Sequence, residues 1–147
     1  HLDPNHPVIL TASGELGLWN NTWNRTDVFG TTLYRYVYNA DLKSFISYPT
    51  TPEFFRATRT FTELTTGKKI PAIISELGAE AWPIKAIVDT PLEEQLMRMN
   101  AKRFNDIIEF AARTSFDEQY LWGAEWWYYL KEVHGRDELW KRAQELF

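Results

Sequence analysis

Four short runs of apolar and β-branched residues recur along the chain, at residues 8–13, 28–34, 70–75 and 119–124. Runs of this length, bounded or interrupted by Gly, Pro or Ser, are typical of strands. The run at 8–13 indicates a buried strand, and the nearly uninterrupted run at 70–75 favours a parallel strand that is covered on both faces. Gly30 in the second run indicates a bulge or a close approach of two backbones.

Apolar residues at helical spacing follow each run, and they predict helices at residues 16–23, 52–66, 92–114 and 126–146. Thr51 and Thr90 are the expected N-caps of the second and third helices. Gly67 is the expected stop of the second helix, and Gly135 interrupts the last one. Residues 36–52, which are aromatic and contain two prolines, are expected to form a long ordered loop.

The resulting order is strand–helix repeated four times, with the second connection expanded. Alternation of this kind predicts an α/β fold with a parallel sheet and right-handed crossovers. The chain has no short-period repeat and no visible domain boundary, so residues 1–147 are expected to form a single domain.

Composition narrows the function classes. Hydrophobic residues make up 44% of the 147 positions, which is enough for a core and argues against disorder. The net charge is −4 and the 16 basic residues are scattered, which argues against a binder of nucleic acid or of an anionic membrane surface. No apolar run approaches the roughly 18 residues that a membrane span requires.

Several chemistries lack their motifs. The chain has no cysteine, no phosphate-binding loop and no G-x-S-x-G elbow. His1, His6 and His134 have no metal-ligand spacing, so we expect neither a metal nor a cofactor. Aromatic residues are abundant at 16%, which suits either a heavily packed core or a surface that stacks on sugar rings.

In parallel α/β folds the reactive groups lie at the carboxyl ends of the strands. Here those ends and the loops after them carry acids, aromatic rings and one arginine: Glu15, Tyr34, Arg35, Tyr36, Glu76, Trp82, Trp122 and Glu125. Two carboxylates beside an aromatic platform are the groups that glycosidic-bond cleavage requires, one as proton donor and the other as nucleophile or base.

Each of these residues also has a structural interpretation. Glu15 can cap a helix or lie solvated in a loop, and Glu80 and Glu125 can be structural acids. Trp122 can fill the core, and Arg35 can pair with a structural carboxylate. Composition and spacing leave these alternatives open.

The run Ile73–Gly78 resembles the nucleophile strand of clan A glycoside hydrolases, the cellulase-like retaining enzymes, whose seventh barrel strand ends in Glu-x-Gly. Residues 120–123 are similar to their eighth strand, which ends in a Trp that forms the floor of the cleavage subsite. The resemblance implies the carboxyl-terminal half of a (β/α)₈ TIM barrel. It implies that Glu76 is the nucleophile, that Tyr34 orients it and that Trp122 stacks on the sugar. Thr32 stands where many members carry His.

A full barrel needs about 250 residues, and half of one leaves two free edges and an uncovered apolar face. We therefore expect a complementary amino-terminal half-barrel chain, or a second copy in a homodimer, with a self-sufficient open sheet as the third alternative. The family's acid/base Glu lies on a fourth strand that is absent here, which makes Glu15 or Glu125 a candidate second carboxylate. The expected substrate is a polysaccharide or glycoside, and an extracellular or cell-surface location is favoured. The alternative function is a catalytically inactive barrel that binds carbohydrate or serves assembly.

Overall fold

The computed structural model describes residues 5–39 and 41–147, which divide into two compact units. Unit 1 takes the described residues up to 33 together with residues 49–77 and 110–120. Unit 2 takes the described residues of 34–48 together with residues 78–109 and 121–147. Each unit therefore draws on three separate stretches of the chain.

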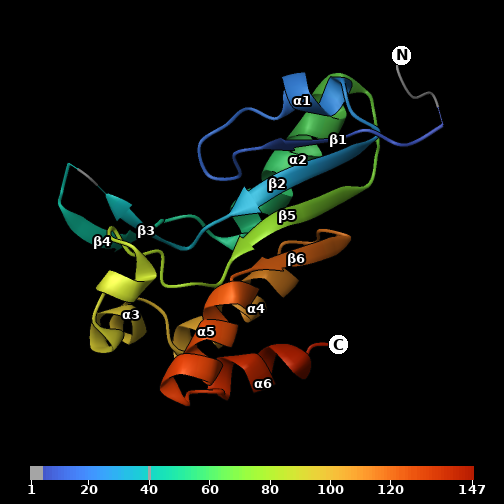
Figure 1. Ribbon diagram of the computed structural model, residues 1–147. Helices are drawn as coiled ribbons and strands as arrows, with labels where there is room; N and C mark the ends of the chain where they lie inside the picture. The colour runs from blue at the N-terminus through green and yellow to red at the C-terminus, as the bar shows by residue number, and fades with distance from the viewer. Residues whose placement is uncertain (1–4, 40) are drawn as a thin grey trace. The chain divides into compact units, whose positions relative to one another are not determined.

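The four predicted strands are confirmed and form a parallel sheet in the order β1-β2-β5-β6 (Figure 1). Their bounds are β1 (Ile9–Ala12), β2 (Val28–Leu33), β5 (Ala72–Gly78) and β6 (Glu118–Trp122). The strands are spatial neighbours in the order in which they occur along the chain. Right-handed crossovers that always step in one direction place their helices on a single face of a sheet. The α/β class is thus confirmed, while the half-barrel stays a prediction.

Unit 1 packs helices α1 (Asn20–Asn24) and α2 (Pro52–Thr66) on one face of the sheet, and Figure 1 shows α2 along β1, β2 and β5. Phe29 of β2 is fully buried, with its ring centroid 5.0 Å from Trp19 and 4.9 Å from Trp23. The predicted ends of α2 are confirmed. The Thr51 hydroxyl accepts a hydrogen bond from the Phe54 amide at 3.3 Å, and Gly67 ends the helix at a φ of 66°.

The prediction that the first strand is buried is wrong. β1 lies at the edge of the sheet, and Ile9 is 51% exposed. Val8 and Leu10 are also exposed. A parallel strand is buried only where neighbours flank it and elements cover both faces, and β1 pairs with a strand on one side alone among the described residues.

A bulge in β5 changes which face its last residues present. Ile74 pairs with Thr31, but the next pair joins Glu76 to Thr32, so Ser75 is an extra residue on β5. Side chains alternate along a strand, and cross-strand partners share a face. The bulge therefore places Glu76 on the face opposite to Phe29 and returns Leu77, which is fully buried, to the helix-covered face.

The described residues of unit 2 form a two-stranded antiparallel sheet and four α-helices. Their bounds are β3 (Tyr36–Asn39), β4 (Ser44–Ser47), α3 (Leu92–Arg98), α4 (Ala101–Ala112, whose last residues count with unit 1), α5 (Ala124–His134) and α6 (Glu138–Gln144). The expected loop at 36–52 is thus partly a hairpin, because Tyr, Val, Phe and Ile are frequent there and favour the extended state.

The long helix predicted at 92–114 is divided into α3 and α4. The Asn100 side chain accepts a hydrogen bond from the Arg103 amide at 3.2 Å and so caps a new helix. Thr90 does not act as the predicted N-cap. Its hydroxyl instead donates to the Ala86 carbonyl at 3.0 Å, across the 3₁₀ turn η1 (Ile87–Asp89). The interruption of the last helix at Gly135 is confirmed.

Candidate functional site

A carboxylate and an indole ring meet in unit 2, where β5 and β6 end. The Trp122 indole N–H donates to Oε1 of Glu80 at 3.2 Å. The backbone beside them is fixed as well, because the Ala79 amide donates to the Trp122 carbonyl at 2.9 Å and the Trp127 indole donates to the Ala79 carbonyl at 2.8 Å. Trp122 remains 46% exposed, so its ring is held in place and yet accessible.

Gly123 makes this close arrangement possible. Its φ of 133° lies in the region that favours glycine, and a Cβ there would stand 3.0 Å from the Glu80 Cβ and 3.1 Å from the Ala79 carbonyl oxygen. The glycine therefore lets the start of α5 lie directly against the backbone that carries Glu80.

The environment of Glu80 raises the pKa of its carboxyl above the usual value. Partial burial is the largest cause, because it disfavours the charged form. The Trp122 hydrogen bond acts in the opposite direction, and the negative charge of Glu125 adds to the rise. Glu80 thus holds its proton to higher pH than an ordinary glutamate, which is a property of groups that serve as general acids.

Replacing Glu80 with Gln should change how stability depends on pH. The raised pKa means that the native state binds this proton more tightly than the unfolded chain does, so wild-type stability falls as pH rises through and above the usual value of 4.5. Glutamine keeps the acceptor for Trp122 but removes the titration. Between about pH 4 and about pH 7, the free energy of unfolding of the variant should therefore rise relative to that of the wild type.

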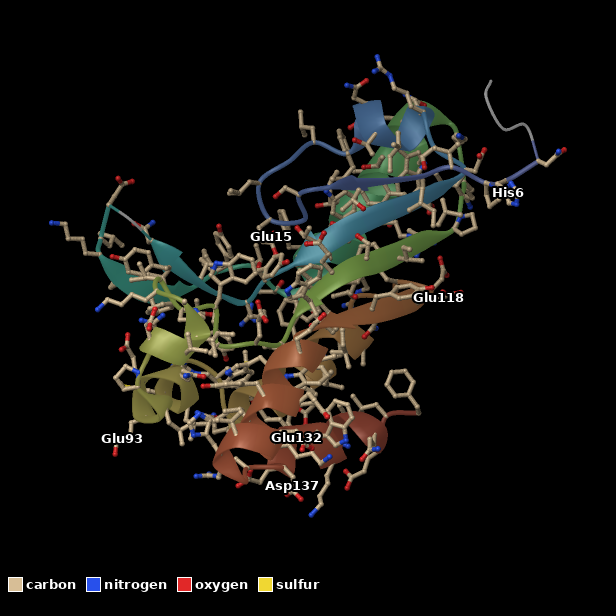
Figure 2. All side chains as sticks on the ribbon, viewed as in Figure 1. His6, Glu15, Glu93, Glu118, Glu132 and Asp137 are labelled. Carbon is tan, nitrogen blue, oxygen red and sulfur yellow. The ribbon has the colours of Figure 1, made fainter. Side chains whose placement is uncertain are left out.

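Urea titrations at several pH values would measure this difference. Glu93→Gln is the matched control, because Glu93 is an exposed acid of the same unit on α3 (Figure 2). The control should follow the wild-type pH dependence. Parallel stability curves for Glu80→Gln and the wild type would contradict the assignment of a raised pKa.

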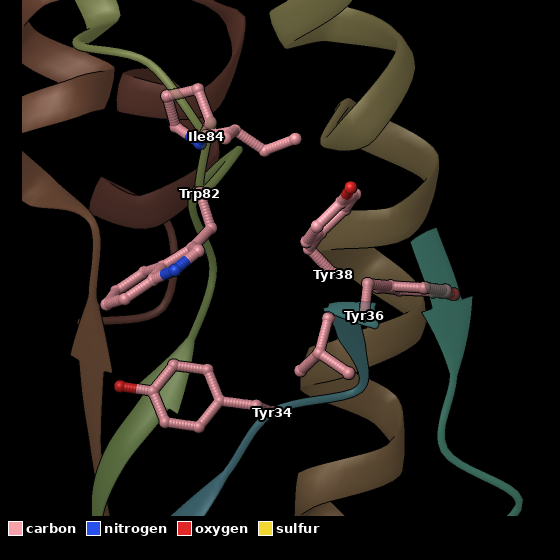
Figure 3. Close-up of a pocket in the computed structure, with 7 residues that line it drawn as sticks. Tyr34, Tyr36, Tyr38, Trp82 and Ile84 are labelled. Carbon is pink, nitrogen blue, oxygen red and sulfur yellow. The ribbon is translucent and has the colours of Figure 1, made fainter. Parts of the chain in front are cut away.

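An aromatic pocket of about 500 Å³ is the second feature of unit 2 (Figure 3). It lies between β3 on one side and the segment after β5 on the other, and it is lined by Tyr34, Tyr36, Val37, Tyr38, Trp82, Pro83 and Ile84. The Tyr34 ring meets the edge of Trp82 at a centroid distance of 5.9 Å. Tyr34 also packs directly on Gly78, where a Cβ would stand 2.2 Å from the tyrosine Cδ1.

Two arginines, Arg98 on α3 and Arg103 on α4, contact the hairpin and the loop that form the walls of this pocket. The Arg98 guanidinium lies 4.1 Å from the centre of the Phe45 ring on β4 and donates to the Trp82 carbonyl at 3.4 Å. Arg98 is buried and also pairs with Glu94. The Arg103 guanidinium lies 4.8 Å from the centre of the Tyr36 ring. The two cation–π contacts fix the hairpin to α3 and α4, and the Arg98 hydrogen bond fixes the loop at Trp82 to α3.

Most of the predicted site residues of unit 2 come together in two groups. Tyr34, Tyr36 and Trp82 line the aromatic pocket, and the carboxylate of Glu125 acts electrostatically on Glu80 beside Trp122. Arg35 donates to the Tyr48 carbonyl at 3.3 Å, which ties the two ends of the hairpin.

Glu76 and Glu15 lie in unit 1, and the residue before Glu15 contacts the sheet partner of Glu76. The Gly14 amide donates to the Thr32 hydroxyl at 3.3 Å, and Thr32 is the sheet partner of Glu76. The loop that carries Glu15 (Figure 2) therefore lies against the same carboxyl end of the sheet as Glu76. Tyr34 and Trp122 belong to unit 2, so their grouping with Glu76 stays a prediction.

Sequence reasoning missed Tyr38, Ile84 and the wall-holding role of Arg98. Tyr36 and Tyr38 are two positions apart, and this spacing is the signal that places both side chains on one face of a strand. Nothing in the local sequence indicates that Arg98 reaches Trp82 and Phe45, because these contacts span 16 and 53 positions of the chain.

Within the described residues, no group of three or more His, Asp or Glu side chains is arranged to hold a metal ion, and His1 lies outside them. Across the same residues, no helix is both long enough and apolar enough to cross a membrane. Comparisons with known protein families, with curated proteins and with solved structures give no match to this chain.

Proposed function

We propose that this chain is the nucleophile-bearing half of a retaining β-glycoside hydrolase, completed by another polypeptide. The observation that supports this proposal is the strand order of the parallel sheet, β1-β2-β5-β6. The strands of this sheet are neighbours in the same order in which they occur along the chain. In (β/α)₈ barrels every strand neighbours the next and all helices lie outside. The opposite face of such a sheet becomes the barrel interior, and Glu76 lies on that face at the carboxyl end of β5.

In the proposed reaction, Glu76 attacks the anomeric carbon and forms a covalent glycosyl-enzyme that water then hydrolyses. This mechanism needs a second carboxyl group about 5 Å from the nucleophile to protonate the leaving group. Glu15 is a candidate from unit 1, because its loop adjoins the sheet partner of Glu76. Glu125 is the candidate from unit 2, and the completing polypeptide is the third source. The exposed ring of Trp122 supports the sugar.

The completing polypeptide is a complementary amino-terminal half-barrel, or alternatively a second copy of this chain. Exposed apolar residues along β1 support this proposal, since an edge strand with free backbone groups is a template for further pairing. Tyr120 on β6 is exposed as well, at the other edge of the sheet.

The test is hydrolysis of aryl β-glycosides with the products followed by proton NMR. Light scattering first establishes whether the chain is a dimer of twice its own mass; a monomer is combined with any polypeptide encoded immediately before residue 1. The proposal expects the β-anomer of the sugar to be released first, because two displacements retain configuration. Initial release of the α-anomer, or sugar binding without any hydrolysis, would contradict it.

Binding without hydrolysis would instead favour the second candidate, a catalytically inactive carbohydrate-binding barrel. The observation behind this alternative is the aromatic surface of unit 2, where Trp122 and Trp82 are both about half exposed. Rings presented in this way stack on the apolar faces of sugars without any need for a nucleophile.

A further inference from the structure

The aromatic pocket of unit 2 offers a ligand rings and aliphatic groups, with few polar atoms. None of the seven described residues that line it is charged or carries an amide side chain. The side-chain polar atoms of the lining residues are the hydroxyls of Tyr34, Tyr36 and Tyr38 and the indole N–H of Trp82. A volume of about 500 Å³ falls within the range of small-molecule sites.

The pocket is also held open in advance. Arg98 joins α3 to the hairpin and to the loop at Trp82, and Arg103 joins α4 to the hairpin. Tyr34 is seated on Gly78, which leaves its ring no room to move toward the strand. A preformed wall lowers the ordering cost of binding.

Trp82 itself is in an unfavourable conformation. Its φ of 41° is unusual for a residue other than glycine, and its large apolar side chain is 51% exposed. Both features cost stability, and such outliers persist where the surrounding structure holds them for a function. Two contacts restrain Trp82: the Arg98 hydrogen bond to its carbonyl and the packing of its ring against Tyr34.

We propose that this pocket binds a neutral aromatic ring of the phenol type. A pyranose carries hydroxyl groups around its rim, and each would lose water in this pocket without a matching partner. A flat ring with one oxygen substituent instead packs between Trp82 and Tyr38 and needs a single polar contact, which a tyrosine hydroxyl supplies. That the ring is the leaving group of an aryl glycoside rests on the proposed function, whereas ring binding itself does not.

The test uses the chain alone with three probes: 4-methylphenol, phenyl β-D-glucopyranoside and methyl β-D-glucopyranoside. Saturation-transfer NMR should show contact through the ring protons of the first two probes, and calorimetry should give the methyl glycoside an affinity at least about tenfold weaker. Equal affinity for the methyl glycoside, or saturation transfer centred on the sugar protons, would overturn the proposal.

Variants localise the binding. Trp82→Ala and Tyr38→Ala should each weaken 4-methylphenol by about fivefold, because each removes one face of the ring contact. Tyr128→Ala is the matched control, since Tyr128 is as exposed as Trp82 in the same unit but lies against Trp140 and does not line the pocket. The two pocket variants should keep the circular dichroism of the wild type. A loss in Tyr128→Ala as large as that in Trp82→Ala would contradict the location.

The outcomes separate the two proposals. Ring binding in a chain that never hydrolyses glycosides leaves this inference standing and removes the proposed function. Hydrolysis by an assembly that does not bind 4-methylphenol does the reverse.

Discussion

Replacing Glu76 with Gln should reduce the hydrolysis of aryl β-glycosides by the completed assembly by at least about a thousandfold. The amide is nearly the same size as the carboxylate but is too weak a nucleophile to form the covalent intermediate. Because Glu76 lies on the face opposite to the buried core of unit 1, the substitution should leave folding intact. Steady-state kinetics of wild type and variant give the ratio directly.

Glu118→Gln is the control for this experiment. Glu118 belongs to the same sheet but stands at the amino end of β6, where it accepts a hydrogen bond from the Tyr120 hydroxyl at 2.8 Å (Figure 2). Its replacement should leave the rate nearly unchanged.

Added azide should also restore turnover to Glu76→Ala and yield the α-glycosyl azide, since a single displacement inverts the anomeric centre. Wild-type rates in Glu76→Gln would remove Glu76 from the role of nucleophile.

Phe29→Ala should lower the free energy of unfolding by about 3–5 kcal/mol. Phe29 is fully buried in β2 and its ring packs against two tryptophans, Trp19 and Trp23, so the truncation leaves a cavity that the surrounding rings fill only in part. Urea unfolding followed by tryptophan fluorescence measures the loss, and both tryptophans report on this part of the core.

Phe61→Ala is the matched truncation. Phe61 lies on the outer side of α2 and is 56% exposed, so its loss removes little buried area and should cost well under about 1 kcal/mol. Similar losses for the two variants would mean that the core of unit 1 is not centred on Phe29.

The parts of the fold that the sequence predicted well depend on local interactions. The helix from Pro52 to Thr66 has its cap at Thr51 and its stop at Gly67, and both signals act within a few residues. The hairpin at Tyr36–Asn39 and Ser44–Ser47 was missed because two nearby prolines favoured a loop interpretation. The division into two units has no local signal at all, since each unit is assembled from three stretches that alternate along the chain.

The same distinction applies to the candidate site. Tyr36 and Trp82 could be predicted as ligand contacts because they follow strand ends, and both line the aromatic pocket. Glu80 was left among the structural alternatives, because its raised pKa depends on burial and on the charge of Glu125, more than 40 positions away. Burial of β1 was mispredicted because an apolar run does not reveal whether its strand lies at the edge of a sheet.

The extra residue Ser75 has a consequence for how such a strand can change over evolution. Up to Ile74, every second side chain of β5 packs against the helices. The bulge at Ser75 shifts this alternation by one residue, so that Leu77 lies in the core and Glu76 lies on the opposite face. A substitution at Glu76 can therefore change the reactive groups at the end of the sheet without changing the packing of the core. If Ser75 paired with Thr32 instead of bulging out, Glu76 would take the helix-covered face and Leu77 the opposite one, so that a substitution at Glu76 would also disturb the core.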